Sequence, residues 1–336
     1  MEIIFDLIEA KNDHNWIVVG GKNMRFGFYL PTRGPQANRT DLKAFLSTAE
    51  QAGFSSVMVA DHIVVPANIE SPYPYTVGGN FVSQGECMEQ LTLMAFVAAA
   101  TEKLRIVSSV MIAPHRNPIL TAKSIATTDV LSEGRVTVGI GVGWMAEEFE
   151  ALSAPDFKAR GRSTDEFVDI WKKLWTGEAV SYNGEFYSFK EILCQPIPIQ
   201  NPHPPIWIGG HSGPALRRVA KLGDGWHPVG ATAASPLPPS EMQQKLGRLR
   251  EETEANGRDF DKLTICYKAP FYDDGKPPAG EARRLFTGGV EAALDDIAEM
   301  EDIGVHELVF DFRGADIQDS LKAMSNFSET IMAKLK

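Results

Sequence analysis

The chain has 336 residues, with 33 Lys and Arg against 44 Asp and Glu, which gives a formal net charge of -11 at pH 7. Nucleic acids and anionic membrane surfaces require a basic face, so this balance argues against both as partners. The length allows either two ordinary domains or one large α/β barrel. The cysteines Cys87, Cys194 and Cys266 lie far apart in the sequence and form neither a disulfide framework nor a zinc pattern, which favours a reducing, cytoplasmic location.

The first 23 residues differ from the rest of the chain. They contain the acids Glu2 and Asp6 and have no long apolar run before a small-residue cleavage site, so we expect no signal or transit peptide. Met24 opens a strand-like run that continues to Leu30. We therefore expect residues 1–23 to be an N-terminal extension that need not be ordered, and residues 24–336 to be one catalytic domain.

From Met24 onward, short apolar runs alternate with amphipathic stretches. The pattern predicts strands at residues 24–30, 56–60, 104–110, 136–141, 206–209, 224–227, 263–268 and 306–311. It predicts helices at residues 41–52, 88–102, 117–131, 163–176, 213–222, 239–256, 289–303 and 317–334. Eight alternating units imply parallel strands with right-handed crossovers. The expected fold class is α/β, a (β/α)8 TIM barrel with long insertions at its C-terminal face.

Three predicted loops, at residues 61–87, 177–205 and 269–288, exceed ordinary loop length, and loops this long are commonly functional. The first contains Tyr73, Tyr75 and the pair Gly78-Gly79, so we expect it to act as a lid over the site. In the second, residues 180–187 predict a hairpin around Asn183-Gly184, because both residues accept the positive φ of a tight turn.

The run from Arg135 to Trp144 ends a predicted strand with three alternating glycines. Without a Cβ, Gly139, Gly141 and Gly143 can bring the main chain close to a planar ligand, and Trp144 would add an aromatic wall. The same residues fit the dinucleotide fingerprint weakly, and tight packing of a strand end explains them equally well.

In a barrel, catalytic groups follow the carboxyl ends of the strands. Here those positions hold four of the seven histidines, which are His62, His115, His211 and His227. Histidine serves as an acid or base, as a metal ligand or as a structural donor. No His-x-His or His-Glu-x-x-His pair is present, so we predict no metal-binding residues, and a metal-dependent barrel hydrolase is the last alternative.

A glycine-rich turn, Gly209 to Gly213, leads from a strand into a helix whose first turn holds Pro214. Free main-chain N–H groups and the positive end of the helix dipole attract a phosphate at such a position. The Ser212 hydroxyl would add a further donor. The alternative interpretation is an ordinary βα loop.

These elements, in this order, resemble the luciferase-like monooxygenase superfamily, and most closely its branch that uses the deazaflavin coenzyme F420. The resemblance covers nearly the whole chain from Met24. The motifs that carry it are Phe26-Gly27, Glu50-x-x-Gly53-Phe54, Asp61-His62, Pro114-x-Arg116-x-Pro118, Ala122-Lys123 through Gly134-Arg135, Gly139-x-Gly141-x-Gly143-Trp144, Arg160-x-Arg162, and Pro205 through Trp226.

The resemblance implies a flavin-type ring at the strand ends, with a non-proline cis peptide, Ser109–Val110, beneath it. It implies that His62 faces the substrate side of the ring. A reference pKa near 6.5 makes His62 the natural proton donor, and Asp61 could orient its imidazole. The cofactor-binding residues would be Ser109, Val110, Met111, Gly141, Gly143, Trp144, Glu147, Gly209, Gly210, His211, Ser212 and Gly213. The substrate pocket would include His115, Trp226 and His227.

The expected function is hydride transfer between coenzyme F420 and a small, apolar or aromatic organic substrate. The sugar-phosphate dehydrogenases of this group have a glutamate where this chain has Trp144, which argues against sugar-phosphate oxidation. One alternative is an FMN-dependent monooxygenase on the same barrel, served by a separate reductase partner. Another is a non-catalytic flavin or deazaflavin carrier. Relatives imply a homodimer.

Overall fold

The computed structural model describes residues 24–81, 85–270, 272 and 283–335. The predicted extension, residues 1–23, lies outside the described residues, as does most of the predicted loop 269–288. Within the described residues, every predicted barrel strand and helix is present, and the observed boundaries differ from the predicted ones by at most a few residues.

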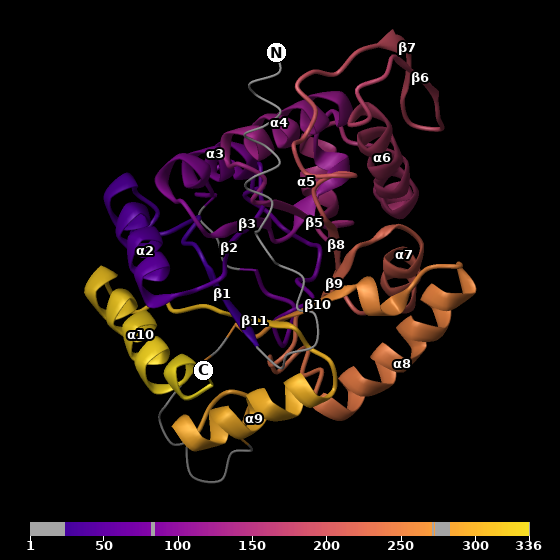
Figure 1. Cartoon of the computed structure of the whole chain (residues 1–336). Helices are drawn as coiled ribbons and strands as arrows, with labels where there is room; N and C mark the ends of the chain where they lie inside the picture. Colours follow the sequence, from indigo (N-terminus) through magenta and orange to yellow (C-terminus); the bar gives the residue numbers. More distant parts are fainter. Residues whose placement is uncertain (1–23, 82–84, 271, 273–282, 336) are drawn as a thin grey trace, which may run out of the picture.

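Eight parallel strands close into a barrel in the described part of the chain, and one of the eight is interrupted (Figure 1). Going round from the third strand, the order is β3-β2-β1-β11-β10-β9-β8-β5, and β5 pairs again with β3. After a break, β4 continues the third strand and also pairs with β5. The predicted TIM barrel is therefore confirmed. The strands are β1 (Arg25–Tyr29), β2 (Ser56–Val59), β3 (Arg105–Ser108), β4 (Met111–Ile112), β5 (Val136–Gly141), β8 (Ile206–Gly209), β9 (Gly225–His227), β10 (Thr264–Lys268) and β11 (Glu307–Phe310).

A ring of helices surrounds the strands (Figure 1). They are α2 (Arg39–Ala52), α3 (Gln90–Ala100), α4 (Pro118–Leu131), α6 (Arg160–Leu174), α7 (Gly213–Leu222), α8 (Pro239–Ala255), α9 (Val290–Asp302) and α10 (Ile317–Thr330). The hydrophobic pattern did not predict α5 (Ala146–Ala151), a short helix that follows the glycine run. Short 3-10 turns lie at Ala113–His115, Phe157–Ala159, Phe260–Lys262 and Met332–Lys334.

Local capping fixes where several helices begin and end. The Asn38 side chain accepts hydrogen bonds from the first turn of α2, and Gly53 ends that helix with φ 84. Asn117 caps α4 in the same way, and Ser212 caps α7. These caps place the loops that precede α4 and α7 at the carboxyl ends of the strands, where the site lies.

The hairpin outside the barrel differs from its prediction. It consists of β6 (Val180–Asn183) and β7 (Ser188–Ile192), and its turn runs from Gly184, whose N–H donates to Tyr187 O at 2.9 Å. Neither Asn183 nor Gly184 has a positive φ, so the predicted tight turn is wrong. The reason is the Glu166 carboxylate, which accepts hydrogen bonds from three successive N–H groups and stabilises a wider turn.

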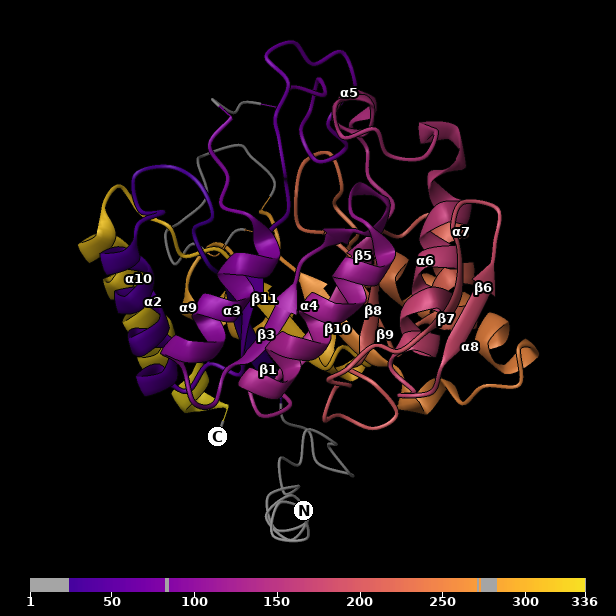
Figure 2. The ribbon, with the colours of Figure 1, turned by 90° about the horizontal axis from the view of Figure 1, so that it is seen from above.

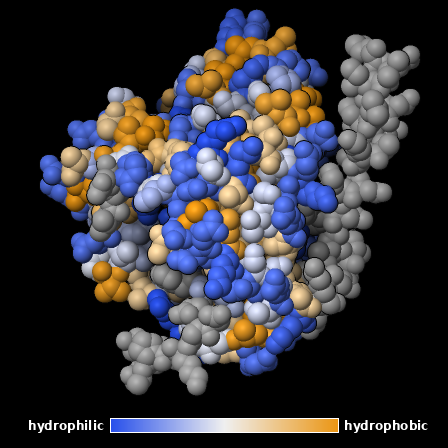
Figure 3. Space-filling model, turned by 90° about the vertical axis from the view of Figure 1, so that its left-hand side faces the viewer, coloured by the Kyte–Doolittle hydropathy of each residue, from blue (hydrophilic) through white to orange (hydrophobic). Residues whose placement is uncertain are grey.

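The core has two layers. Inside the barrel, a small cluster of buried side chains closes the centre, and its members are Tyr29, Met58, Val107, Trp207, Cys266 and Val309. A larger apolar layer fills the space between strands and helices. On the face shown in Figure 3, hydrophilic residues predominate and apolar ones are mostly scattered among them. The inner cluster forms the floor on which the site rests.

Candidate functional site

A cavity of about 350 Å³ opens at the carboxyl ends of the barrel strands. This volume is within the usual range for small-molecule sites. The loop between β2 and α3 lies at the same end of the barrel as α5 (Figure 2). The predicted site residues that line the cavity are Asp61, His62, Ser109, Val110, His115, Gly143, Trp144, Gly209, Gly210 and His227. The predicted residues Met111, Gly141, Glu147, His211, Ser212, Gly213 and Trp226 are not among its lining residues.

His62 is held by a carboxylate from the short helix α5. Its Nδ1 lies 2.9 Å from Glu148 Oε2, and Glu148 is 1% exposed. A carboxylate only accepts, so Nδ1 carries the hydrogen and Nε2 is left for a ligand. Burial alone would raise the pKa of Glu148, but the hydrogen bond and charge of His62, with further help from the Ile63 N–H, hold that pKa below its ordinary value.

Asp61 has a different role from the predicted one. Its carboxylate accepts from Ile112 N at 2.9 Å and from both terminal nitrogens of Arg116, at 2.8 and 2.7 Å. It therefore positions the third strand just after the break, and Glu148 rather than Asp61 orients the imidazole of His62. Burial opposes the charge of Arg116, but its bonds to Asp61 dominate and raise the pKa of the guanidinium.

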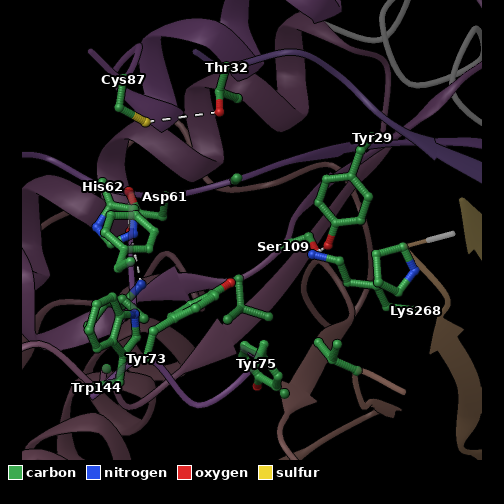
Figure 4. Close-up of a pocket in the computed structure, with 18 of the residues that line it drawn as sticks. Tyr29, Thr32, Asp61, His62, Tyr73, Tyr75, Cys87, Ser109, Trp144 and Lys268 are labelled. Atoms are coloured by element: carbon green, nitrogen blue, oxygen red, sulfur yellow. Dashed lines mark hydrogen bonds between the residues drawn. The ribbon is translucent and has the colours of Figure 1, made fainter. Parts of the chain in front are cut away.

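Three aromatic rings surround His62. The ring centroids of Tyr73 and Phe81 lie 5.1 and 5.2 Å from that of Trp144, and Phe81 lies 5.1 Å from His62. Figure 4 shows Trp144 and Tyr73 on the same side of the cavity as His62. These contacts give one half of the cavity a largely apolar wall, formed by the loop after β2 and the residue that follows the glycine run.

Glu147 fastens that loop. Its Oε1 accepts from Glu70 N at 2.8 Å and from Ser71 N at 2.9 Å, and Ser71 Oγ in turn accepts from Ala146 N at 3.1 Å. The loop and the start of α5 are thus joined by three hydrogen bonds. Glu147 was predicted to bind the cofactor, and the structure places its carboxylate against the main chain of the loop.

The peptide bond between Ser109 and Val110 is cis, as the resemblance implies. The Val110 side chain fits between two glycines of neighbouring strands. A Cβ on Gly141 would lie 2.7 Å from Val110 Cγ2, and one on Gly209 would lie 3.0 Å from Val110 Cγ1. These glycines therefore make room for Val110, whereas we predicted that the glycine run would approach a ligand directly. Gly143, with φ 84, does line the cavity.

The opposite wall carries a chain of hydrogen bonds. Tyr29 Oη bonds to Ser109 Oγ, and Ser109 Oγ lies 2.8 Å from His227 Nε2. His227 Nδ1 lies 3.1 Å from the carbonyl oxygen of Cys266. Burial lowers the pKa of His227 to about 4. Sequence analysis predicted His227 and Ser109 but did not predict that they touch.

Lys268 completes this wall. Its Nζ lies 3.7 Å from the centre of the Tyr29 ring, within range of a cation–π contact. Burial lowers the pKa of Lys268 to about 7, and the charge of Asp311 opposes the shift. Tyr29 and Lys268 are the last residues of β1 and β10. Neither was predicted, although catalytic groups of a barrel are expected at the carboxyl ends of its strands.

His115 is the least satisfied of the cavity's histidines. Within the described residues neither of its ring nitrogens has a hydrogen-bond partner, and Nδ1 lies 3.8 Å from Glu148 Oε1. The ring packs edge-on against Phe149, with centroids 4.5 Å apart. Burial lowers the pKa of His115 to about 4, so the ring is neutral near pH 7.

The turn before α7 is held by a buried tryptophan. Trp226 Nε1 donates to Gly210 O at 2.7 Å, and Gly210 has φ 80. Trp226 is fully buried, so it supports the turn and does not line the cavity. The main-chain N–H groups of His211, Ser212 and Gly213 donate no hydrogen bond to the described part of the chain. Such donors at a helix start suit an anionic group.

Among the described residues, no group of three or more His, Cys, Asp or Glu is arranged to hold a metal ion. None of their helices is long and apolar enough to span a membrane.

Comparison with known proteins gives a family match over most of the chain. The model of the luciferase-like monooxygenase family matches residues 24–307. An uncharacterized protein of Mycobacterium tuberculosis is 30% identical over 320 residues, which cover 92% of this chain and 96% of that protein. An F420-dependent glucose-6-phosphate dehydrogenase of Nakamurella multipartita is 29% identical over 287 residues, covering 83% of this chain and 78% of the dehydrogenase. An FMNH2-dependent dimethylsulfone monooxygenase of Pseudomonas putida is 32% identical over 171 residues, which cover 50% of this chain and 45% of the monooxygenase.

Solved structures share the fold. The monooxygenase RslO1 of Streptomyces bottropensis superposes with a TM-score of 0.73 at 20% identity, covering 93% of this chain and all of its own. The coenzyme F420-dependent tetrahydromethanopterin reductase of Methanopyrus kandleri gives 0.71 at 17% identity, covering 94% of this chain and all of its own. At these identities the likeness shows the barrel alone.

Proposed function

Because the chain belongs to the luciferase-like monooxygenase family, whose members include F420-dependent and FMN-dependent enzymes, we propose that it is an F420-dependent oxidoreductase. The reaction would be hydride transfer between coenzyme F420 and a small, apolar or aromatic organic substrate. The observation that carries the proposal is the His62–Glu148 pair, which leaves one imidazole nitrogen free in a cavity that Ser109 and Val110 also line.

The residues of the cavity fit a planar ring with a phosphate-bearing tail. Val110, Gly209 and Gly210 line one surface of the cavity, next to the turn that precedes α7. The N–H groups at the start of α7 have no acceptor among the described residues and would receive the phosphate. When bound, a deazaflavin supplies two-electron hydride chemistry, because a carbon replaces the reactive nitrogen of a flavin.

His62 would exchange the proton that accompanies the hydride. Its Nδ1 is committed to Glu148, so Nε2 is the atom that would give a proton to the substrate or receive one from it. Glu148 is buried and ionised, and it would stabilise the imidazolium and keep the ring in one orientation. Glu148 is thus a positioning residue, and His62 is the catalytic one.

The aromatic wall supports an apolar substrate. Trp144, Tyr73 and Phe81 stand around His62, so a ligand that reaches Nε2 would contact at least one aromatic face. Closure of the loop after β2, which Glu147 fastens, would also keep water from the reacting atoms.

A reaction test separates this proposal from its alternatives. The purified protein is given F420H2 and, one at a time, small enones, imines and aldehydes without oxygen, and the return of oxidised F420 is followed by absorbance. We expect oxidation with at least one acceptor, and a loss of roughly 100- to 10,000-fold in His62→Asn, the range for a general acid or base. A carrier would be favoured if the protein binds F420 but oxidises F420H2 with none of the acceptors, and if His62→Asn binds F420 as tightly as the wild type does.

The FMN-dependent relative supports a second candidate, a monooxygenase that receives reduced FMN from a separate reductase. In that case oxygen uptake would follow the addition of reduced FMN and an apolar substrate, and F420H2 would not be consumed. A homodimer remains a prediction, to be checked by the mass of the protein in solution.

A further inference from the structure

The hydrogen-bond chain on the wall opposite His62 has only one possible direction. The carbonyl oxygen of Cys266 can only accept, so His227 Nδ1, 3.1 Å away, must carry a hydrogen. His227 is 1% exposed, and no carboxylate of the described residues bonds to it. It is therefore neutral, in agreement with its lowered pKa, and its Nε2 has a lone pair and no hydrogen.

This tautomer determines in which direction the hydroxyl groups of Ser109 and Tyr29 donate. Ser109 Oγ lies 2.8 Å from His227 Nε2, so the serine hydroxyl must donate to that nitrogen. A hydroxyl has one hydrogen, and once it is committed the Ser109 oxygen can only accept from Tyr29. The Tyr29 hydroxyl therefore donates to Ser109 and has no hydrogen left for any other partner.

The Tyr29 oxygen can still accept one hydrogen bond, and the Tyr29 side chain lines the cavity. The phenol is neutral at ordinary pH, because burial raises the pKa of Tyr29. Lys268 does not occupy the acceptor position: its Nζ lies over the centre of the Tyr29 ring, at 3.7 Å, and makes no hydrogen bond within the described residues. Figure 4 shows Tyr29, Ser109 and Lys268 together, across the cavity from His62 and Trp144.

We propose that Tyr29 is a specificity-determining hydrogen-bond acceptor, which selects ligands that present an O–H or N–H group to this wall over matched ligands that present only an ether or carbonyl oxygen. The proposal names a substrate class, hydroxyl- or amine-bearing molecules, for the cavity of the proposed function. It rests on that cavity being the ligand site, but it does not depend on which cofactor binds.

Two small aromatic probes test it on the full-length protein. Phenol and anisole have nearly the same shape, and anisole replaces the hydroxyl hydrogen by a methyl group. Anisole is the more apolar, so a purely hydrophobic site would bind it more tightly. Ligand-observed NMR titrations should instead show phenol binding about 3- to 10-fold more tightly, the ratio expected from one hydrogen bond.

Variants locate the preference. Tyr29→Phe removes the acceptor. The ratio of the affinity for phenol to the affinity for anisole should then fall to about 1 or below, since the hydrogen bond is gone. Tyr75→Phe is the matched control, because Tyr75 lines the same cavity without belonging to the chain of hydrogen bonds, and it should keep the wild-type ratio. Ser109→Ala frees the hydrogen of Tyr29, so anisole should bind this variant more tightly than it binds the wild type.

The outcomes separate this inference from the proposed function. Equal binding of both probes by the wild type, including no measurable binding of either, overturns the inference, and so does an unchanged ratio in Tyr29→Phe. A protein that prefers phenol through Tyr29 but does not oxidise F420H2 supports the inference and contradicts the proposed function. A protein that oxidises F420H2 but does not prefer phenol supports the proposed function and contradicts the inference.

Discussion

Glu148 Oε2 lies 2.9 Å from His62 Nδ1, although the two residues are 86 positions apart in the sequence. Because the carboxylate also accepts from Ile63 N at 2.8 Å, it is fixed from two directions, and it fixes the imidazole in turn. This contact leaves Nε2 as the His62 nitrogen that can exchange a proton with a ligand, and the first prediction follows from it.

Glu148→Gln should impair catalysis without impairing cofactor binding. The Ile63 N–H will donate to the amide oxygen of the new glutamine, as it does to the carboxylate. The amide nitrogen will therefore face His62 and donate to Nδ1. The imidazole must then carry its hydrogen on Nε2, and turnover of F420H2 should fall by roughly 100-fold, the lower end for a general acid or base. The dissociation constant of F420, measured by titration, should change less than about twofold, since this carboxylate does not hold the ring.

Glu150→Gln is the control for that variant, because Glu150 lies on the same short helix and is exposed. It should leave turnover unchanged. Equal turnover in Glu148→Gln and the wild type would mean that the carboxylate does not determine the protonation of His62.

Gly141→Ala should displace the side chain of Val110. The new methyl group would lie 2.7 Å from Val110 Cγ2, closer than a normal contact. We expect a loss of about 1–3 kcal/mol in the free energy of unfolding, as for other overpacked cores. The double variant Gly141→Ala, Val110→Ala should recover part of it, because the second change removes the methyl groups that clash. Urea denaturation of the four proteins in this cycle measures the coupling, and strictly additive effects would contradict the account.

His115 should make the folded protein sensitive to acid. The pKa of His115 is lowered to about 4 in the folded state, whereas the unfolded chain takes up this proton below about pH 6.5. Unfolding is therefore favoured as the pH falls from about 6.5 to 4. At pH 5 this one group should cost about 2 kcal/mol of stability relative to pH 8.

The variant His115→Phe tests that prediction, because a phenyl ring fills the same space against Phe149 and does not titrate. The free energy of unfolding should fall less between pH 8 and pH 5 in the variant than in the wild type, by about the same 2 kcal/mol. The same pH dependence in both proteins would mean that His115 is already charged in the folded state.

Glu147→Ala should loosen the loop after β2. The variant loses two charge-assisted hydrogen bonds, to Glu70 N and Ser71 N. A single such bond contributes about 1.5–3 kcal/mol, so the open form of the loop should be populated at least about 10-fold more. Limited proteolysis within residues 61–81 should accelerate accordingly, and Glu150→Ala should be cleaved like the wild type. An unchanged rate in Glu147→Ala would show that this carboxylate does not fasten the loop.

The sequence predicted the barrel because its signals are local. The limits of β8 and α7 agree with prediction, since apolar runs end at glycine and the helix begins at a Ser cap followed by Pro214. The partners within the site could not be predicted in this way. Ser109 meets His227 across 118 residues, and only closure of the barrel brings them together.

The roles of individual residues were harder to predict than their positions. Asp61 was considered able to orient the imidazole of His62, but adjacency in the sequence does not bring two side chains together. Its carboxylate turns to Arg116 instead. The glycine run predicted a close approach correctly, but the group that approaches Gly141 is Val110 of the same chain.

The most direct test of the central claim is a titration of the purified protein with oxidised F420 and, separately, with FMN, followed by tryptophan fluorescence. Trp144 lines the cavity and should report a bound ring, and Trp144→Phe should lose most of the signal while still binding. The account predicts saturation by F420 at micromolar concentration, and binding of FMN at least about 10-fold weaker, a difference of about 1.4 kcal/mol. Tighter binding of FMN than of F420 would contradict it.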